Sequence, residues 1–171
     1  NSTAVIFGAG SVGRGFLGQL FSESGYEVVF VDVDEELINS LSAAKKYTLR
    51  LAGIDRTEDR VIGPVRGVDG RSVESVATEV AGAGMIATAV GARALPAVAR
   101  SIARGIALRS EDAGPLNIIL CENLHDAPDI LRNSVRDALP QELRSSFVNT
   151  VGFVPAVIAR MSPVPTPEQR A

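Results

Sequence analysis

The chain has 171 residues, of which 46% are hydrophobic and 22% charged, and its formal net charge is −3. This length and composition are those of one globular domain with its own core, not of a tail or a linker protein. A chain with a negative net charge has no broad electrostatic attraction for nucleic acids or anionic membranes. We therefore expect neither a nucleic acid nor a membrane as a partner. A small molecule is the expected ligand.

Signals for targeting and for metal binding are missing from the sequence. No apolar run approaches the roughly 18 residues that span a bilayer, and a strand-like segment begins almost at residue 1, which leaves no room for a signal peptide. We therefore expect a soluble, cytoplasmic protein. Cys121 is the single cysteine and His125 the single histidine, so we expect no internal disulfide, no tetrahedral zinc site and no bound metal.

Strand and helix patterns alternate along most of the chain. Hydrophobic spacing predicts strands at residues 4–7, 27–32, 85–90 and 116–121, and helices after residue 12 and at 35–44, 72–81, 92–107, 127–138 and 141–147. The strand at 27–32 shows almost no alternation, as expected when helices cover both faces of a parallel sheet. The chain is therefore predicted to adopt a Rossmann-type, doubly wound α/β fold with a mostly parallel sheet.

Residues 47–70 depart from this alternation. Residues 47–51 alternate between apolar and polar side chains, and residues 61–68 are interrupted by Gly63, Pro64 and Gly67. We interpret this segment as an antiparallel excursion at a sheet edge.

Gly8, Gly10 and Gly13 form a G-x-G-x-x-G pattern between the first strand and the first helix. Such glycines permit a tight turn, close approach of the backbone to a pyrophosphate, and close helix–strand packing. Asp32 follows Gly13 by 19 residues, at the end of the second strand, where a carboxylate can accept hydrogen bonds from ribose hydroxyls. NAD is the predicted cofactor, and not NADP. The residues that follow Asp32 include further acids and no nearby arginine, so a 2′-phosphate would be repelled there. The alternative is a glycine turn in an apo fold, with Asp32 merely starting a loop.

Four stretches resemble one family, in order and spacing, over nearly the whole chain. They are FGAGSVGRGFLGQL at 7–20, TAVG at 88–91, PLNIILCEN at 115–123 and VGFVPAVIARMSP at 151–163. Together they resemble the mannitol-1-phosphate 5-dehydrogenases, within the polyol-specific long-chain dehydrogenase family. The resemblance implies hydride exchange between NAD and a hexitol phosphate, interconverting mannitol 1-phosphate and fructose 6-phosphate. It also implies a loop at 88–91 beside the cofactor, and Asn123 as the group that polarises the substrate oxygen.

Two features of the chain differ from this family. The last signature usually has aspartate before its arginine, where this chain has Ala159 before Arg160, and Pro155 stands where a polar residue is common.

The family's proton-transferring lysine belongs to a helical C-terminal domain. We therefore expect residues 1–160 to form the NAD-binding domain and 161–171 an exit linker toward that domain. A stand-alone NAD-binding regulatory module, or a dehydrogenase for another polyol, hexonate or hydroxyacid, is the alternative.

The candidate site combines the glycine loop, the end of the second strand and the loops after two later strands. Its predicted cofactor-binding residues are Gly8, Ala9, Gly10, Ser11, Val12, Gly13, Asp32, Val33, Thr88, Ala89, Val90, Gly91 and Asn123. Arg14, in the first helical turn, is predicted to contact a cofactor or substrate phosphate, or else to pair with a local carboxylate.

Three later residues have competing interpretations. Asn123 either polarises the substrate oxygen or caps the following helix. His125 is interpreted as a loop or helix-start residue and not as a general base, and Cys121 as a small apolar strand residue and not as a nucleophile.

Overall fold

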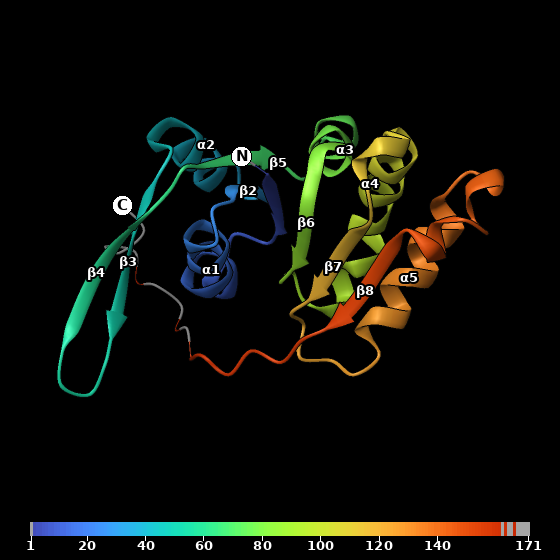
Figure 1. The fold of residues 1–171 in the computed structure, drawn as a ribbon. Helices are drawn as coiled ribbons and strands as arrows, with labels where there is room; N and C mark the ends of the chain where they lie inside the picture. Colours follow the sequence, from blue (N-terminus) through green and yellow to red (C-terminus); the bar gives the residue numbers. More distant parts are fainter. Residues whose placement is uncertain (1, 162, 164–165, 167–171) are drawn as a thin grey trace.

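The computed structural model describes residues 2–161, 163 and 166. Within these residues a six-stranded parallel sheet has the strand order β5-β2-β1-β6-β7-β8 (Figure 1). The strands are β1 (Thr3–Phe7), β2 (Glu27–Asp32), β5 (Val65–Asp69), β6 (Ala83–Thr88), β7 (Leu116–Leu120) and β8 (Val151–Pro155). Numbered along the chain within this sheet, the order is 3-2-1-4-5-6, which is that of dinucleotide-binding sheets. The predicted Rossmann-type fold is confirmed.

The helices form two layers, one on each face of the sheet. They are α1 (Gly18–Glu23), α2 (Glu35–Ala44), α3 (Val73–Gly82), α4 (Leu95–Leu108) and α5 (Ala127–Ala138), and a π-helical turn, η1 (Gly13–Leu17), leads into α1. Short 3₁₀ turns are η2 (Ala92–Ala94), η3 (Glu111–Ala113), η4 (Gln141–Leu143) and η5 (Phe147–Asn149). Residues 141–147, predicted to be one helix, instead contain η4 and the start of η5.

Alternate strand residues supply the two halves of the core, as the period of a strand requires. Phe7 and Ile86 face α3, α4 and α5 in one buried cluster. Ile6 and Phe30 face η1 and α2 in the other. Both faces of β1 and β2 are buried, so their residues are apolar except at the ends, where Thr3, Glu27 and Asp32 are half-buried.

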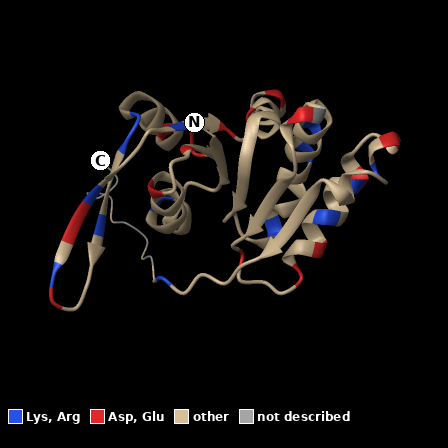
Figure 2. Ribbon diagram, in the orientation of Figure 1, with Lys and Arg blue, Asp and Glu red and all other residues tan. Residues whose placement is uncertain are grey.

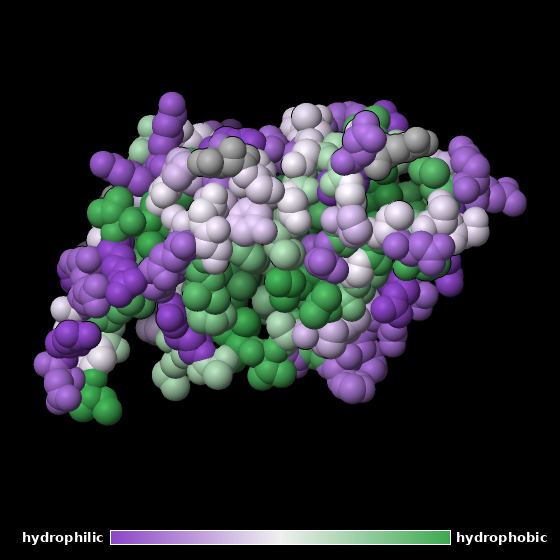
Figure 3. All heavy atoms as spheres, viewed as in Figure 1, coloured by the Kyte–Doolittle hydropathy of each residue, from purple (hydrophilic) through white to green (hydrophobic). Residues whose placement is uncertain are grey.

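The half of the sheet formed by β6, β7 and β8 has one open face. On the α1 side no described helix covers these three strands, so Asn117 is exposed, Ile119 is half-buried and Val154 is 41% exposed. Figure 2 shows that this face carries few charges, and Figure 3 shows hydrophobic residues gathered over α1, the neighbouring ends of β6 and β7 and the segment after β8.

The predicted antiparallel excursion is confirmed in part of its range. β3 (Tyr47–Ala52) and β4 (Thr57–Ile62) form an antiparallel hairpin that projects from the body of the domain (Figure 1). The interpretation fails for Val65–Asp69, which is β5 and pairs in parallel with β2. Gly63 and Pro64 end the hairpin, and the chain then joins the edge of the main sheet. A helix does not connect β4 to β5, which is why the sequence pattern concealed a parallel strand.

Candidate dinucleotide-binding site

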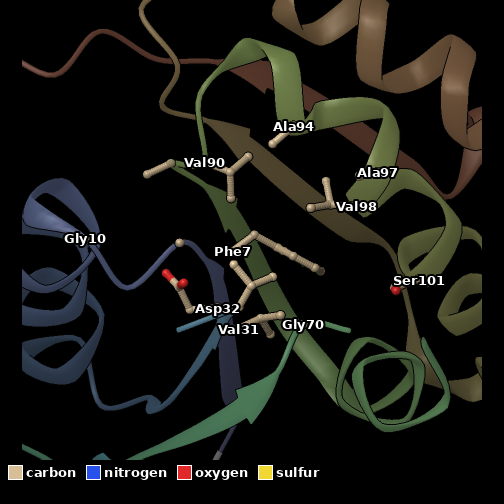
Figure 4. A pocket seen from close by; sticks show the side chains of 13 residues that line it. Phe7, Gly10, Val31, Asp32, Gly70, Val90, Ala94, Ala97, Val98 and Ser101 are labelled. Carbon is tan, nitrogen blue, oxygen red and sulfur yellow. The ribbon is translucent and has the colours of Figure 1, made fainter. Parts of the chain in front are cut away.

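A pocket of about 320 Å³ lies at the carboxyl ends of β1, β2 and β6 (Figure 4). In doubly wound sheets this is the edge at which ligands bind. Six of the predicted cofactor residues line the pocket: Gly8, Gly10, Asp32, Val33, Ala89 and Val90. The opposite wall, which the sequence motifs did not predict, is supplied by η2 and α4 through Ala94, Ala97, Val98 and Ser101. These small, partly apolar side chains leave a slot beside the Asp32 carboxylate.

The three motif glycines have different surroundings. Gly8 has a φ of +100°, and a Cβ there would overlap the carbonyl oxygen of Ala89. A Cβ at Gly13 would overlap the carbonyl oxygen of Gly8, so this glycine lets the helix start against the turn. A Cβ at Gly10 would meet no atom within 4 Å. Gly8 and Gly13 are therefore required by the turn itself, whereas the space at Gly10 is open to a ligand.

The helix after the glycine loop begins with a π-helical turn that has two remote attachments. The Arg14 N–H donates to the Gly10 carbonyl at 3.0 Å, which places the start of the helix directly after the glycine loop. The Tyr47 hydroxyl donates to the Arg14 carbonyl at 2.6 Å, and the Arg160 guanidinium donates to the Gly15 carbonyl at 3.2 Å. Side chains from β3 and from the segment after β8 thus satisfy carbonyl groups of this turn.

Asp32 is hydrogen-bonded to the glycine loop. Its Oδ2 accepts from the Ala9 N–H at 2.8 Å, and its Oδ1 accepts from the Asp34 N–H at 3.1 Å. A carboxylate has about four acceptor positions, so both oxygens can still accept from ribose hydroxyls. Figure 4 shows the carboxylate pointing from the end of β2 toward the loop at Gly10.

An arginine does reach the surroundings of Asp32, which the sequence analysis did not expect. Arg71 follows β5, and Gly70 beside it donates its N–H to the Asp32 carbonyl at 2.8 Å. The Arg71 guanidinium is paired with Asp69 at 2.8 Å and with Glu35 at 3.1 Å. These two carboxylates offset its charge, so the acidic character around Asp32 persists.

Arg14 folds back onto the loop. Its Nε donates to the Ala9 carbonyl at 2.6 Å, so the side chain connects the start of the helix to the glycine turn. The predicted contact of Arg14 with a phosphate stays a prediction.

The loop after β6 is attached to the loop after β7. The Ala89 N–H donates to the Phe7 carbonyl at 2.8 Å, while Glu122 accepts from the Val90 N–H at 3.1 Å and from the Gly91 N–H at 2.7 Å. Nothing in the sequence motifs predicted this role for Glu122. Thr88 is fully buried, and its hydroxyl has no hydrogen-bond partner in the described part of the chain. It is not among the residues that line the pocket.

Asn123 has an unusual backbone conformation for a side chain other than glycine. Its φ is +51°, in the left-handed region that asparagine tolerates better than most residues. Its Oδ1 accepts from the Ile158 N–H at 3.2 Å, which leaves the amide NH₂ as a donor. This N–H lies in the segment after β8, not at the start of α5, so the capping alternative has no support here.

His125 and Cys121 flank this loop without joining the pocket. His125 is exposed in the turn before α5, and the pocket lining does not include it. Cys121 is buried, and burial, with a smaller effect from the Glu122 charge, raises the pKa of its thiol to about 11. A thiol that is protonated at neutral pH is a poor nucleophile.

Neither a metal cluster nor a membrane-spanning helix is present among the residues that the structure describes. No group of three His, Cys, Asp or Glu side chains there could hold a metal ion. None of the described helices is both long enough and apolar enough to cross a bilayer.

The strand order, the glycine turn and the placement of Asp32 define a dinucleotide-binding domain of the dehydrogenase type. The family described as the mannitol dehydrogenase Rossmann domain matches residues 2–170, and the chain belongs to this family. The resemblance stated from the sequence motifs is thus confirmed.

Individual relatives agree with this assignment. The chain is 40% identical over 162 residues to a mannitol-1-phosphate 5-dehydrogenase of Brevibacillus brevis, covering 94% of this chain and 42% of the relative. An Arthrobacter enzyme of the same name is 43% identical over 153 residues, covering 86% of this chain and 40% of the relative. The chain therefore spans about two fifths of the length of these curated relatives.

Solved structures support the fold. An octopine dehydrogenase structure with NADH and L-arginine superimposes with a TM-score of 0.66, at 12% identity, over 95% of this chain and 40% of that one. At this identity the similarity concerns the fold alone.

Proposed function

We propose that this chain is the NAD(H)-binding part of a polyol dehydrogenase that interconverts mannitol 1-phosphate and fructose 6-phosphate. The observation that carries the cofactor is the joint placement of Asp32 and Gly10 at one pocket. Asp32 holds the N–H of Ala9 while keeping acceptor capacity for ribose hydroxyls, and Gly10 leaves room where a side chain would stand.

The residues present fit a dinucleotide. A pocket of about 320 Å³ falls within the roughly 300–1,000 Å³ of small-molecule sites, and it opens beside the N-terminus of a helix, which favours phosphate groups. The adenosine ribose would bind Asp32, the pyrophosphate would lie over Gly10, and the wall of Ala97 and Val98 would cover the adenine. Bound NAD supplies the hydride acceptor for oxidation of an alcohol.

The choice of substrate rests on the family and on Asn123. The relatives at about 40% identity are mannitol-1-phosphate 5-dehydrogenases, so a hexitol phosphate is the proposed substrate. The Asn123 NH₂ is free to donate toward the substrate oxygen because its carbonyl oxygen is held by Ile158. A donor fixed in this way can stabilise the charge that develops on the oxygen during hydride transfer.

The remaining chemistry belongs to a second domain. The relatives extend well beyond the region that this chain matches, and we propose that their helical part supplies the proton-transferring lysine. Residues 161–171 would lead to it; most of them lie outside the described residues. The open face of β6, β7 and β8 with Val154 exposed on it, and the exposed Val157 and Met161 in the segment after β8, support a covering partner in that region. A cytoplasmic location stays a prediction from the sequence.

Calorimetric titration of the chain with NADH and with NADPH tests the cofactor proposal directly. We expect NADH to bind and NADPH to bind at least about tenfold more weakly, because a 2′-phosphate would face the Asp32 carboxylate. Absence of NADH binding to folded protein, or equal affinity for the two cofactors, would contradict it.

A further inference from the structure

We propose that Glu122 is a positioning residue that holds one wall of the cofactor pocket in its binding conformation. The inference rests on the proposed function, because it concerns how the same pocket is kept ready for NAD(H). It assigns a role to an acidic side chain that the glycine motif does not contain and that does not itself line the pocket.

The wall in question is the loop that follows β6. Ala89 and Val90 line the pocket, and the carbonyl of Ala89 packs so closely on Gly8 that a Cβ at Gly8 would overlap it. A shift of this loop would therefore change both the pocket and the glycine turn. In Figure 4 the Val90 side chain lies over the pocket, between the glycine loop and Ala94.

The loop is attached at its two ends by different means. At its start, the Ala89 N–H donates to Phe7 and so continues the pairing of β6 with β1. Beyond this bond the sheet no longer supports the chain, and Gly91 has a φ of +84°, a conformation open to glycine. The Val90 and Gly91 N–H groups instead both donate to Glu122, from the loop after β7.

Two consecutive N–H donors bond to one side chain here, and each has an acceptor atom of its own. The Glu122 carboxylate provides both atoms, with Oε1 accepting from Val90 and Oε2 from Gly91. A glutamine of the same length offers one acceptor, and its NH₂ would stand against the other N–H. Hydrogen bonds to charged acceptors are also stronger than neutral ones, so a carboxylate fixes the loop better than an amide does.

The experiment compares Glu122→Gln with a matched control, Glu142→Gln, in the whole chain. Glu142 is exposed in η4, so this variant loses the same charge away from the pocket. Titrations of NADH followed by its fluorescence give the Kd, and amide NMR spectra report the Val90 and Gly91 N–H signals. We expect Glu122→Gln to raise the Kd about tenfold and to move these two signals upfield, while Glu142→Gln changes neither.

A second variant separates positioning from general loss of stability. Glu122→Asp keeps two acceptor oxygens on a shorter side chain, so its Kd should lie between those of the wild type and Glu122→Gln. An unchanged Kd in Glu122→Gln, unmoved loop signals, or weaker binding by the aspartate than by the glutamine variant would each overturn the inference. Failure of the folded wild-type chain to bind NADH would overturn the proposed function, and the inference with it.

Discussion

The Arg160 guanidinium donates a 2.7 Å hydrogen bond to Oε1 of Gln19, across 141 residues of sequence. The same guanidinium lies over the Phe16 ring, 4.7 Å from its centroid. The segment after β8 is thereby fastened to the helix that starts at the glycine loop. Since Ile158 in this segment also holds Asn123, one stretch of chain connects the cofactor helix to the loop of the proposed oxygen-polarising group.

Replacing Arg160 with Ala should lower the free energy of unfolding by about 1–2 kcal/mol. Gln19 is 5% exposed, so loss of Arg160 leaves a buried amide oxygen without this donor and removes the contact with the Phe16 ring. Urea unfolding measures the change. Arg100→Ala, an exposed position on α4, is the control, and equal effects of the two variants would contradict the attachment.

Replacing Asp32 should weaken NADH binding and narrow the preference over NADPH. Asp32→Ala removes the acceptor for both the ribose and the Ala9 N–H, whereas Asp32→Asn keeps one acceptor oxygen and removes the charge. We expect at least a tenfold rise in the Kd for NADH with alanine and a smaller rise with asparagine. NADPH should bind no worse to either variant, because the carboxylate that is removed would also have repelled its 2′-phosphate. Calorimetry with both cofactors gives the comparison, and an unchanged ratio of affinities would exclude the role of Asp32 in selectivity.

Replacing Gly10 with Val should abolish cofactor binding with little loss of stability. No atom lies within 4 Å of a Cβ built at Gly10, so the added side chain would occupy the place of the pyrophosphate. Gly13→Ala is the contrasting variant, since its Cβ would overlap the Gly8 carbonyl and disturb the turn. Thermal unfolding and NADH titration distinguish them. A Gly10→Val protein that binds NADH normally would show that this loop does not face the phosphates.

The sequence could predict the parts of the site that depend on local pattern. The glycine turn, Asp32 at the end of a buried strand, and α2 at Glu35–Ala44 all follow from spacing and from residue type. Distant contacts were not predictable in this way. Arg71 comes beside Asp32 because β5 pairs with β2, and Glu122 reaches the loop after β6 because β7 pairs with β6. The β8 strand was not predicted because Val151–Pro155 contains a glycine and ends in proline, two residues that are disfavoured in strands.

Cys121 should react with thiol reagents at pH 8 far more slowly in the folded chain than in the unfolded one. Burial raises the pKa of its thiol from 9.0 to about 11, so almost no thiolate is present in the folded protein at this pH. As the pH rises, the Cys121 thiol is deprotonated in the unfolded chain before it is deprotonated in the folded one. Its contribution to the free energy of unfolding should therefore decline between about pH 9 and 11. Colorimetric thiol titration with and without denaturant tests the first point. Rapid reaction in the native state would contradict the burial of Cys121.

The chain alone should bind NADH yet show no measurable oxidation of mannitol 1-phosphate. Asn123 is proposed to polarise the substrate oxygen, but no lysine lines the described pocket, and the Lys45 carbonyl accepts from the Val65 N–H at the start of β5, the edge of the sheet opposite the pocket. Positioning of the alcohol and removal of its proton both contribute large factors to such rates. The assay measures NADH formation with saturating NAD and hexitol phosphate. A protein of the relatives' length, carrying this domain and its helical continuation, should turn over in the same assay. Robust turnover by the chain alone would mean that a base among these residues suffices, and His125, exposed beside Asn123, would be the first to replace.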